Sequence, residues 1–177
     1  MTDRVVKLAR LALLLALATV IHTAEGLLPI TFVWFRFGFA NIIGLAALEL
    51  FGFKDAVLVT LGRILLGSMA YGVFGSPAFM MSLSGGACAI LAMGLAYSFG
   101  DKIFSEIGVS VTGAVAHNMA QLAVAYFLVV RNEGILLLLP VLLLTAAATG
   151  LINGLAARFF VKRFRSIESE KVRSVVP

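Results

Sequence analysis

The amino-acid sequence predicts an all-α polytopic membrane protein, built as a compact bundle of six transmembrane helices. Hydrophobic residues make up 61% of the 177 residues and charged residues only 13%, whereas soluble domains contain about 45–50% and about 25%. A soluble fold of this size could not bury so much apolar surface, but the hydrocarbon of a bilayer solvates it. We therefore expect the lipid bilayer to surround most of the chain.

Six apolar stretches reach or approach the roughly 17–25 residues that a helix needs to cross the hydrocarbon. Gly75-Ser76-Pro77 breaks the chain between the third and the fourth. Pro140 lies near the start of the sixth, where the first helical turn has no donor bond to lose. The predicted spans are residues 5–28, 38–51, 55–74, 77–99, 108–130 and 134–160, within one domain of residues 1–165 that precedes a polar cytoplasmic tail, residues 166–177.

The distribution of lysine and arginine predicts the orientation. Basic residues gather before the first span, in the second and fourth connections and after the sixth span. The positive-inside rule assigns these segments to the cytoplasm. We therefore expect a multi-pass protein of the cell (plasma) membrane with both termini cytoplasmic, and an even number of spans agrees with this.

Polar side chains inside apolar spans point to a functional site. Arg63 lies about halfway along the third span, and His117, Asn118 and Gln121 lie near the middle of the fifth. Spacings of three and four place the last three residues along one stripe of a helix. A charged side chain at the bilayer centre costs about 2.5–3.5 kcal/mol, so a chain retains one for a reason.

Further polar groups lie at similar depth in other spans. Glu25 and Asn41 lie near the outer ends of the first two spans, and Ser84-Gly85-Gly86 lies in the outer half of the fourth. Two glycines weaken a helix and let a ligand approach its backbone. Structural roles are the alternative: an interhelical hydrogen bond for Asn118, an Arg63–Glu25 pair and close packing at the glycines.

Because five of the six spans offer such a group, we favour a substrate-binding cavity that opens to the extracellular side. Arg63, His117, Asn118 and Gln121 would line it. Glu25 and Asn41 would lie at its mouth, and Ser84, Gly85 and Gly86 would supply backbone contacts. The substrate would be a small molecule whose identity the sequence leaves open.

Small residues recur at one-turn spacing in two spans. Ala146, Gly150 and Gly154 repeat every four residues in the sixth span, and Ala12 and Ala16 lie one turn apart in the first. Such spacing lets helix backbones approach closely in lipid. For the sixth span we expect packing within the bundle. For Ala12 and Ala16, contact with a partner protein is a rival to internal packing.

Other classes of function lack their motifs. The net charge is +5, but no basic face alternates with aromatic residues, so we do not expect nucleic-acid binding. The three aspartates form no D-D-x-x-D run and no Walker loop is present. One cysteine and two histidines on different spans make a poor metal site. We therefore expect no enzyme activity, no cofactor and no metal.

Several segments carry a resemblance to a known family. They are FGFAN at 37–41, LFGFK at 50–54, RILLG at 63–67, SLSGG at 82–86 and GVSVTGAVAHNMAQL at 108–122. With them, residues 8–160 resemble the Gx transporter family, which is also catalogued as heptaprenyl diphosphate synthase component I. That family is similar to the substrate-binding S components of energy-coupling factor (ECF) importers.

The resemblance implies a fold like that of an ECF S component, a six-helix protein with an outward-facing ligand site. It also implies that Ala12 and Ala16 dock an ECF transmembrane coupling subunit, which is driven by ATPases. The chain would then be the substrate-binding subunit of an importer of small, vitamin-type solutes. The catalogue name offers an alternative, a non-catalytic membrane subunit associated with heptaprenyl (polyprenyl) diphosphate or quinone synthesis.

Overall fold

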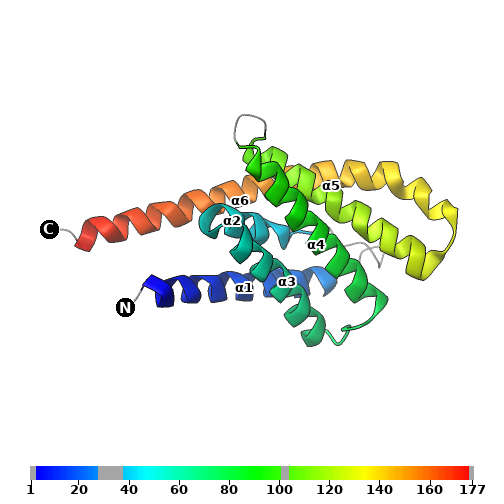
Figure 1. Ribbon diagram of the computed structural model, residues 1–177, viewed down its shortest axis with the longest axis horizontal. Helices are drawn as coiled ribbons and strands as arrows, with labels where there is room; N and C mark the ends of the chain where they lie inside the picture. The colour runs from blue at the N-terminus through cyan, green and yellow to red at the C-terminus, as the bar shows by residue number, and fades with distance from the viewer. Residues whose placement is uncertain (1–2, 28–37, 101–103, 176–177) are drawn as a thin grey trace.

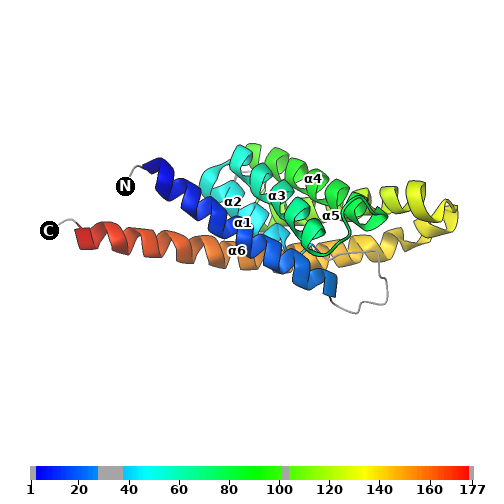
Figure 2. The same cartoon turned by 90° about the horizontal axis from the view of Figure 1, so that it is seen from below.

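A computed structural model describes the backbone of residues 3–27, 38–100 and 104–175, with side chains for 4–26, 38–100 and 104–169. Throughout these ranges the secondary structure is helical, with no strand. Both termini lie on the same side of an elongated bundle (Figures 1 and 2). The helices are α1 (Asp3–Leu27), α2 (Asn41–Phe51), α3 (Phe53–Ala70), α4 (Pro77–Ser98), α5 (Glu106–Val124) and α6 (Leu139–Val175). A π-helical turn, Ala125–Val130, and a 3₁₀ turn, Glu133–Leu138, connect α5 to α6.

The predicted count of six helices is confirmed for the described residues, but the helices are unequal. Within the described ranges, four segments are long and apolar enough to cross a membrane: Arg4–Gly26, Pro77–Ser98, Glu106–Val130 and Glu133–Ser169. Helix α3 has 18 residues, but Lys54, Asp55 and Arg63 lie within it. Helix α2 has only 11 residues, which at 1.5 Å per residue covers roughly half of a core about 30 Å thick.

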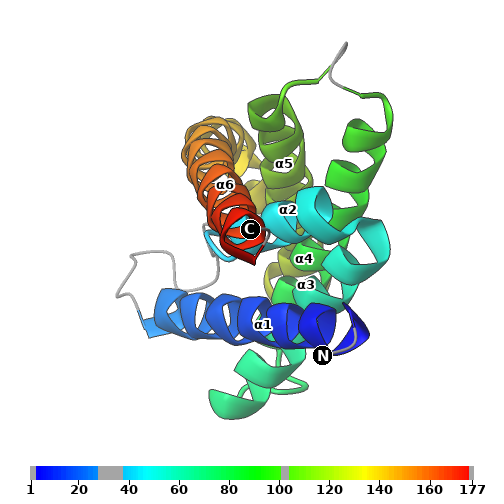
Figure 3. The ribbon, with the colours of Figure 1, turned by 90° about the vertical axis from the view of Figure 1, so that its left-hand side faces the viewer.

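Helix α2 is the central element of the bundle. Figure 3 shows it between α1, α6 and the pair of α4 and α5. Seven of its eleven residues are buried, from Asn41 to Leu48. An apolar stretch of this length is more typical of a buried core helix than of a spanning one. Residues 38–51, predicted as the second span, thus contain a shorter helix at the centre of the bundle, where their apolar side chains pack against other helices.

Small residues allow α5 and α6 to touch along their backbones, as predicted for the sixth span. A Cβ atom built on Gly150 would lie 2.6 Å from Cα of Val111, and one on Gly154 would lie 2.9 Å from Cα of Ile107. Ala146, one turn before Gly150, is completely buried. In contrast, Ala12 and Ala16 are both exposed on α1. They therefore do not pack inside the bundle.

Three ion pairs between described residues lie at the end of the bundle that carries both termini, here called the terminal end. Lys7 pairs with Asp55 (Nζ to Oδ2, 2.5 Å), Arg10 with Glu168 (Nη1 to Oε1, 2.6 Å) and Arg158 with Glu106 (Nε to Oε2, 3.5 Å). They join α1 to α3, α1 to α6 and α5 to α6. The helix ends that the charge pattern assigned to one side of the membrane thus lie together.

Helix α6 is much longer than a span. Its 37 residues extend roughly 55 Å, and Pro140 is its second residue, in the first turn where we expected it to be tolerated. The helix continues without a break through residue 166, where the sequence suggested that a tail begins. Phe164 fixes this extension to the bundle, because its ring lies 6.2 Å from that of Phe51 and beneath the guanidinium of Arg10.

Candidate functional site

Arg63 lies at the centre of a group of buried polar side chains. It is 2% exposed. Its Nη2 donates to Oδ1 of Asn41 on α2 at 2.6 Å, and its Nη1 lies 3.3 Å from Nδ1 of His22 on α1. An arginine can only donate, so Nδ1 of His22 is the acceptor and that imidazole is neutral here. These two bonds, both to neutral acceptors, join α3 to α1 and α2.

The backbone just before α2 is held by hydrogen bonds to side chains of α1 and α6. Oε1 of Glu25 accepts hydrogen bonds from the backbone N–H groups of Gly38 (2.5 Å) and Phe39 (3.1 Å). The carbonyl of Gly38 accepts from Nδ2 of Asn153 on α6 at 3.1 Å. Gly38 has φ +75°, where glycine carries no steric penalty. Glu25, predicted at the mouth of a cavity, thus anchors the backbone that leads into α2.

His117 and Gln121 reach the same region from α5. Nε2 of Gln121 lies 3.0 Å from Nε2 of His117, and both residues are buried. A Cβ atom on Gly38 would lie 3.5 Å from the His117 ring and 2.8 Å from Nδ2 of Asn41. His117 and Asn41 thus flank Gly38. We call Arg63, His22, Asn41, Glu25, His117, Gln121 and Asn153 the mid-depth cluster.

Three other predicted site residues lie differently. Asn118, expected beside His117, faces α6 instead, where its Nδ2 donates to the carbonyl of Leu142 at 2.9 Å. Consecutive helical residues project about 100° apart, so His117 and Asn118 cannot both face the cluster. The hydroxyl of Ser84 donates to the carbonyl of Met81 in its own helix. A Cβ atom on Gly86 would overlap Cδ1 of Ile64, so this glycine permits close packing.

Gly85 supports the cluster through its missing side chain. A Cβ atom there would lie 2.9 Å from Cε1 and Nδ1 of His117 and 3.0 Å from Cγ of Gln121. Gly67 plays the same part on α3, where a Cβ atom would lie 2.6 Å from Cδ2 of His22. The two imidazoles of the cluster therefore each rest against a glycine of a neighbouring helix, which fixes the plane of the ring.

Three members of the cluster, Arg63, Asn41 and His117, lie at similar distances along their helices from the terminal end. Arg63 is ten residues from the start of α3 at Phe53, Asn41 is ten residues from the end of α2 at Phe51, and His117 is eleven residues from the start of α5 at Glu106. At 1.5 Å per residue each is about 15–17 Å from the terminal end, which is half the thickness of a bilayer core. The N-terminus of α2 therefore lies at mid-depth.

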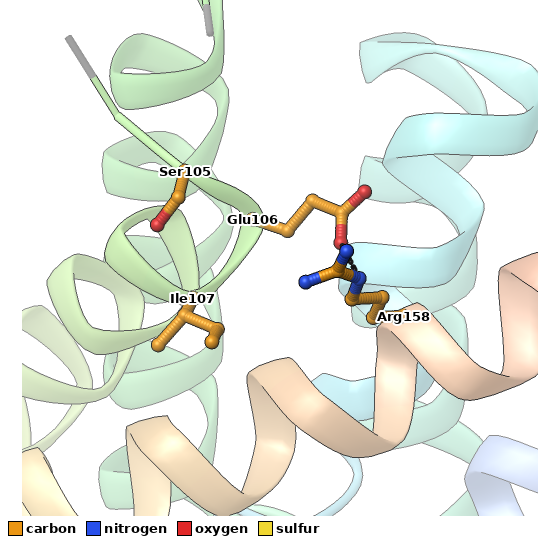
Figure 4. A pocket seen from close by; sticks show the side chains of 4 residues that line it. All are labelled: Ser105, Glu106, Ile107 and Arg158. Atoms are coloured by element: carbon orange, nitrogen blue, oxygen red, sulfur yellow. Dashed lines mark ion pairs between the residues drawn. The ribbon is translucent and has the colours of Figure 1, made fainter.

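A separate open pocket of about 260 Å³ lies at the terminal end, lined by Ser105, Glu106, Ile107 and Arg158 (Figure 4). Its two charged side chains point toward each other and form an ion pair. Ser105 caps α5, since its hydroxyl oxygen accepts from the N–H of Gly108 at 3.2 Å. The polar groups of this pocket thus have structural tasks, and the mid-depth cluster is the better candidate site.

Sequence reasoning missed some members of the cluster. Asn153 was visible as a lone amide in the apolar sixth span, and His22 as a second intramembrane imidazole. No sequence pattern could indicate the role of Gly38, because Glu25 and Asn153 bind its backbone N–H and carbonyl groups. Arg36, a further cation close to Gly38 in the sequence, lies outside the described residues. Among the described residues no group of three or more His, Cys, Asp or Glu side chains could hold a metal ion.

These features define a helical membrane protein with a buried polar cluster at mid-depth. A family model described as heptaprenyl diphosphate synthase component I matches residues 14–160. The chain belongs to this family, which agrees with the resemblance seen in its segments. Comparisons with curated proteins and with solved structures found no match.

Proposed function

We propose that this protein is the substrate-binding membrane subunit of an importer for a small solute. The observation that carries the proposal is the mid-depth cluster, to which α1, α2, α3, α5 and α6 all contribute a polar side chain. Arg63, His117 and Gln121 would contact the substrate. Enzyme activity has no part in this proposal, because the chain has neither a D-D-x-x-D run nor a Walker loop.

The half-length α2 supports the same function. Many transporters bind substrate near the bilayer midplane, at the ends of discontinuous helices whose N-termini provide a positive dipole. Helix α2 starts at this depth, among Asn41, Arg63 and His117. One buried acceptor of the cluster, Oδ1 of Asn153, has no hydrogen-bond partner among the described residues, and a buried polar atom of this kind is usually satisfied by water or a ligand.

Native mass spectrometry of the purified protein, looking for a retained small molecule, tests the proposal. We expect one molecule per chain in the wild type and a clear loss in Arg63→Ala and His117→Ala. Asn118→Ala is the matched control, because Asn118 is adjacent in sequence but bonds to α6, so its occupancy should match the wild type. Equal occupancy in all four proteins would give Arg63 and His117 a purely structural role.

Ala12 and Ala16 would form the docking face for an ECF transmembrane coupling subunit, driven by ATPases. Their exposure supports this role, since close helix contacts in lipid use small residues. Replacing both by leucine should abolish co-purification with the coupling subunit, while the retained small molecule stays bound. Leu13→Ala, at an exposed position between them, is the control that leaves both alanines intact.

We place the terminal end in the cytoplasm and the protein in the cell membrane. The cations of this end, among them Arg4, Lys7, Lys54 and Arg158, support this orientation. Single cysteines at residues 3 and 170, in a Cys88→Ala background, should both be shielded from an impermeant thiol reagent in intact cells. Labelling of either position from outside would refute the topology.

The family description supports a second candidate, a non-catalytic membrane subunit associated with heptaprenyl diphosphate synthesis. In that case a soluble synthase should co-purify with the protein, and its activity should depend on the protein. Variants of the mid-depth cluster distinguish the two candidates. An importer subunit loses its small molecule in Arg63→Ala, whereas a scaffold for a cytoplasmic enzyme keeps its partner.

A further inference from the structure

The mid-depth cluster contains side chains of opposite charge, Arg63 and Glu25, so from the sequence alone its substrate could be an anion or an amine. The hydrogen bonds of the two side chains differ in kind. Glu25 accepts from two backbone N–H groups, whereas Arg63 donates to a side-chain amide and an imidazole. This difference indicates which of the two charges serves the substrate.

Glu25 has a structural task. Its Oε1 binds the N–H groups of Gly38 and Phe39 at 2.5 and 3.1 Å, and the residue is 6% exposed. A carboxylate that accepts two backbone N–H bonds is stabilised as an anion and holds that part of the chain in place. A cationic substrate would have to compete with these two bonds and would release the backbone that leads into α2.

Arg63 is suited to exchange a partner. The amide of Asn41 and the imidazole of His22 are neutral acceptors, and bonds from a guanidinium to a carboxylate are roughly twice as strong as neutral ones. The planar fork of arginine also matches two oxygens at once. A carboxylate that replaces either neutral acceptor forms the stronger hydrogen bond with Arg63, whereas a positively charged group can form none with it.

The surroundings of Arg63 favour negative charge as well. The N-terminus of α2, with its positive dipole, begins at Asn41, the residue that binds Arg63. Gln121 brings an amide N–H group from α5 to the imidazole of His117. Oδ1 of Asn153, which accepts no hydrogen bond from the described part of the chain, would suit a hydroxyl or N–H group elsewhere on the substrate.

We propose that the substrate carries a carboxylate or a similar oxyanion, which Arg63 binds directly at the N-terminus of α2, and that Glu25 positions the backbone instead of binding a cation. This inference rests on the proposed substrate-binding function and adds the chemical class of the substrate.

The test compares two isosteric variants, Arg63→Gln and Glu25→Gln. In Glu25→Gln an amide oxygen can still accept from Gly38 and Phe39, so binding should weaken by no more than about threefold. In Arg63→Gln the loss of a charged hydrogen-bond donor should weaken binding about 10- to 100-fold. Arg63→Lys keeps the charge without the fork and should fall between them. Circular dichroism and size-exclusion chromatography check that each variant folds.

Two readouts are used. Small molecules retained by the purified proteins are extracted and identified by mass spectrometry. Melting temperatures are measured with benzoate, benzamide and benzylamine, which share one ring and differ only in an anionic, neutral or cationic group. We expect a retained molecule with an acidic group, stabilisation by benzoate alone among the three probes, and loss of both effects in Arg63→Gln.

The outcomes separate the two proposals. A neutral or cationic retained molecule, stabilisation by benzylamine, or a loss in Glu25→Gln as large as in Arg63→Gln would overturn the inference and leave the substrate-binding function standing. If the wild type retains no molecule and none of the three probes shifts its melting temperature, the substrate-binding function fails, and the inference fails with it.

Discussion

Arg63 and Arg158 are the same side chain in opposite settings. Arg63, at mid-depth, is 2% exposed and reaches neutral groups of α1 and α2. The side chain of Arg158, at the terminal end, is 65% exposed and meets the carboxylate of Glu106 at 3.5 Å. Arg158 could lose its partner to water at little cost. Arg63 is 2% exposed, so the loss of a partner would leave a buried donor unsatisfied.

The comparison shows that the two regions use charge for different purposes. At the terminal end, exposed pairs are each worth about 0–1 kcal/mol, and the number of cations matters more for orientation than for stability. At mid-depth, each polar atom must be satisfied by another group or remain at a cost of about 1–3 kcal/mol. A chain that retains such a cluster inside lipid has a use for it.

The largest expected effect comes from Arg63→Met. Removal of the guanidinium leaves the acceptors of Asn41 and His22 without this donor, and we expect a loss of about 3 kcal/mol in the free energy of unfolding. Arg158→Met should cost less than about 1 kcal/mol. Unfolding in mixed micelles by titration with sodium dodecyl sulfate measures both variants. Equal losses would show that burial does not distinguish the two arginines.

A smaller effect is expected from replacing two glycines by alanine, one beside the mid-depth cluster and one at the start of α5. Gly85→Ala forces a methyl group against the His117 ring and Gln121, and overpacking of this kind costs about 1–3 kcal/mol. Gly108→Ala, in the first turn of α5, meets its nearest neighbour at 3.4 Å and should be neutral or stabilising, because alanine favours helix. Melting temperatures in detergent measure both, and a tolerated Gly85→Ala would mean that the imidazole can move.

Double-mutant cycles isolate the interaction energies. For Arg63→Met with Asn41→Ala we expect a coupling of about 1.5–2 kcal/mol, in the range for buried, directly bonded groups. The four proteins of the cycle are compared by their free energies of unfolding under one set of conditions. A coupling below about 0.5 kcal/mol would show that the 2.6 Å contact contributes little.

The smallest effect belongs to the pair of Arg158 and Glu106. Its coupling should be about 0.2–1 kcal/mol and should decrease between low and high salt, because exposed charges are screened within a Debye length of about 10 Å at 0.1 M. The Arg63–Asn41 coupling should not change with salt. The same cycle, repeated at two ionic strengths, tests this. A salt-sensitive coupling at Arg63 would indicate that water and ions reach the cluster.

The sequence by itself determined the class of the protein and much of its framework. Composition required a lipid environment, because so many apolar side chains cannot be buried in a soluble fold of this length. Apolar stretches and their breaks predicted six helices, and small residues at one-turn spacing predicted the close packing of α6. The rarity of polar residues in lipid singled out Arg63, His117 and Gln121.

Only the tertiary structure decided how these elements meet. The apolar pattern of residues 38–51 is the same for a spanning helix and for a buried half-length one, so the central place of α2 could not be predicted. Helical spacing groups His117 and Asn118 on α5, but the positions of α4 and α6 determine which neighbour each side chain reaches. The bonds of Glu25 and Asn153 to Gly38 involve peptide groups, which every residue carries, and so no side-chain pattern could reveal them.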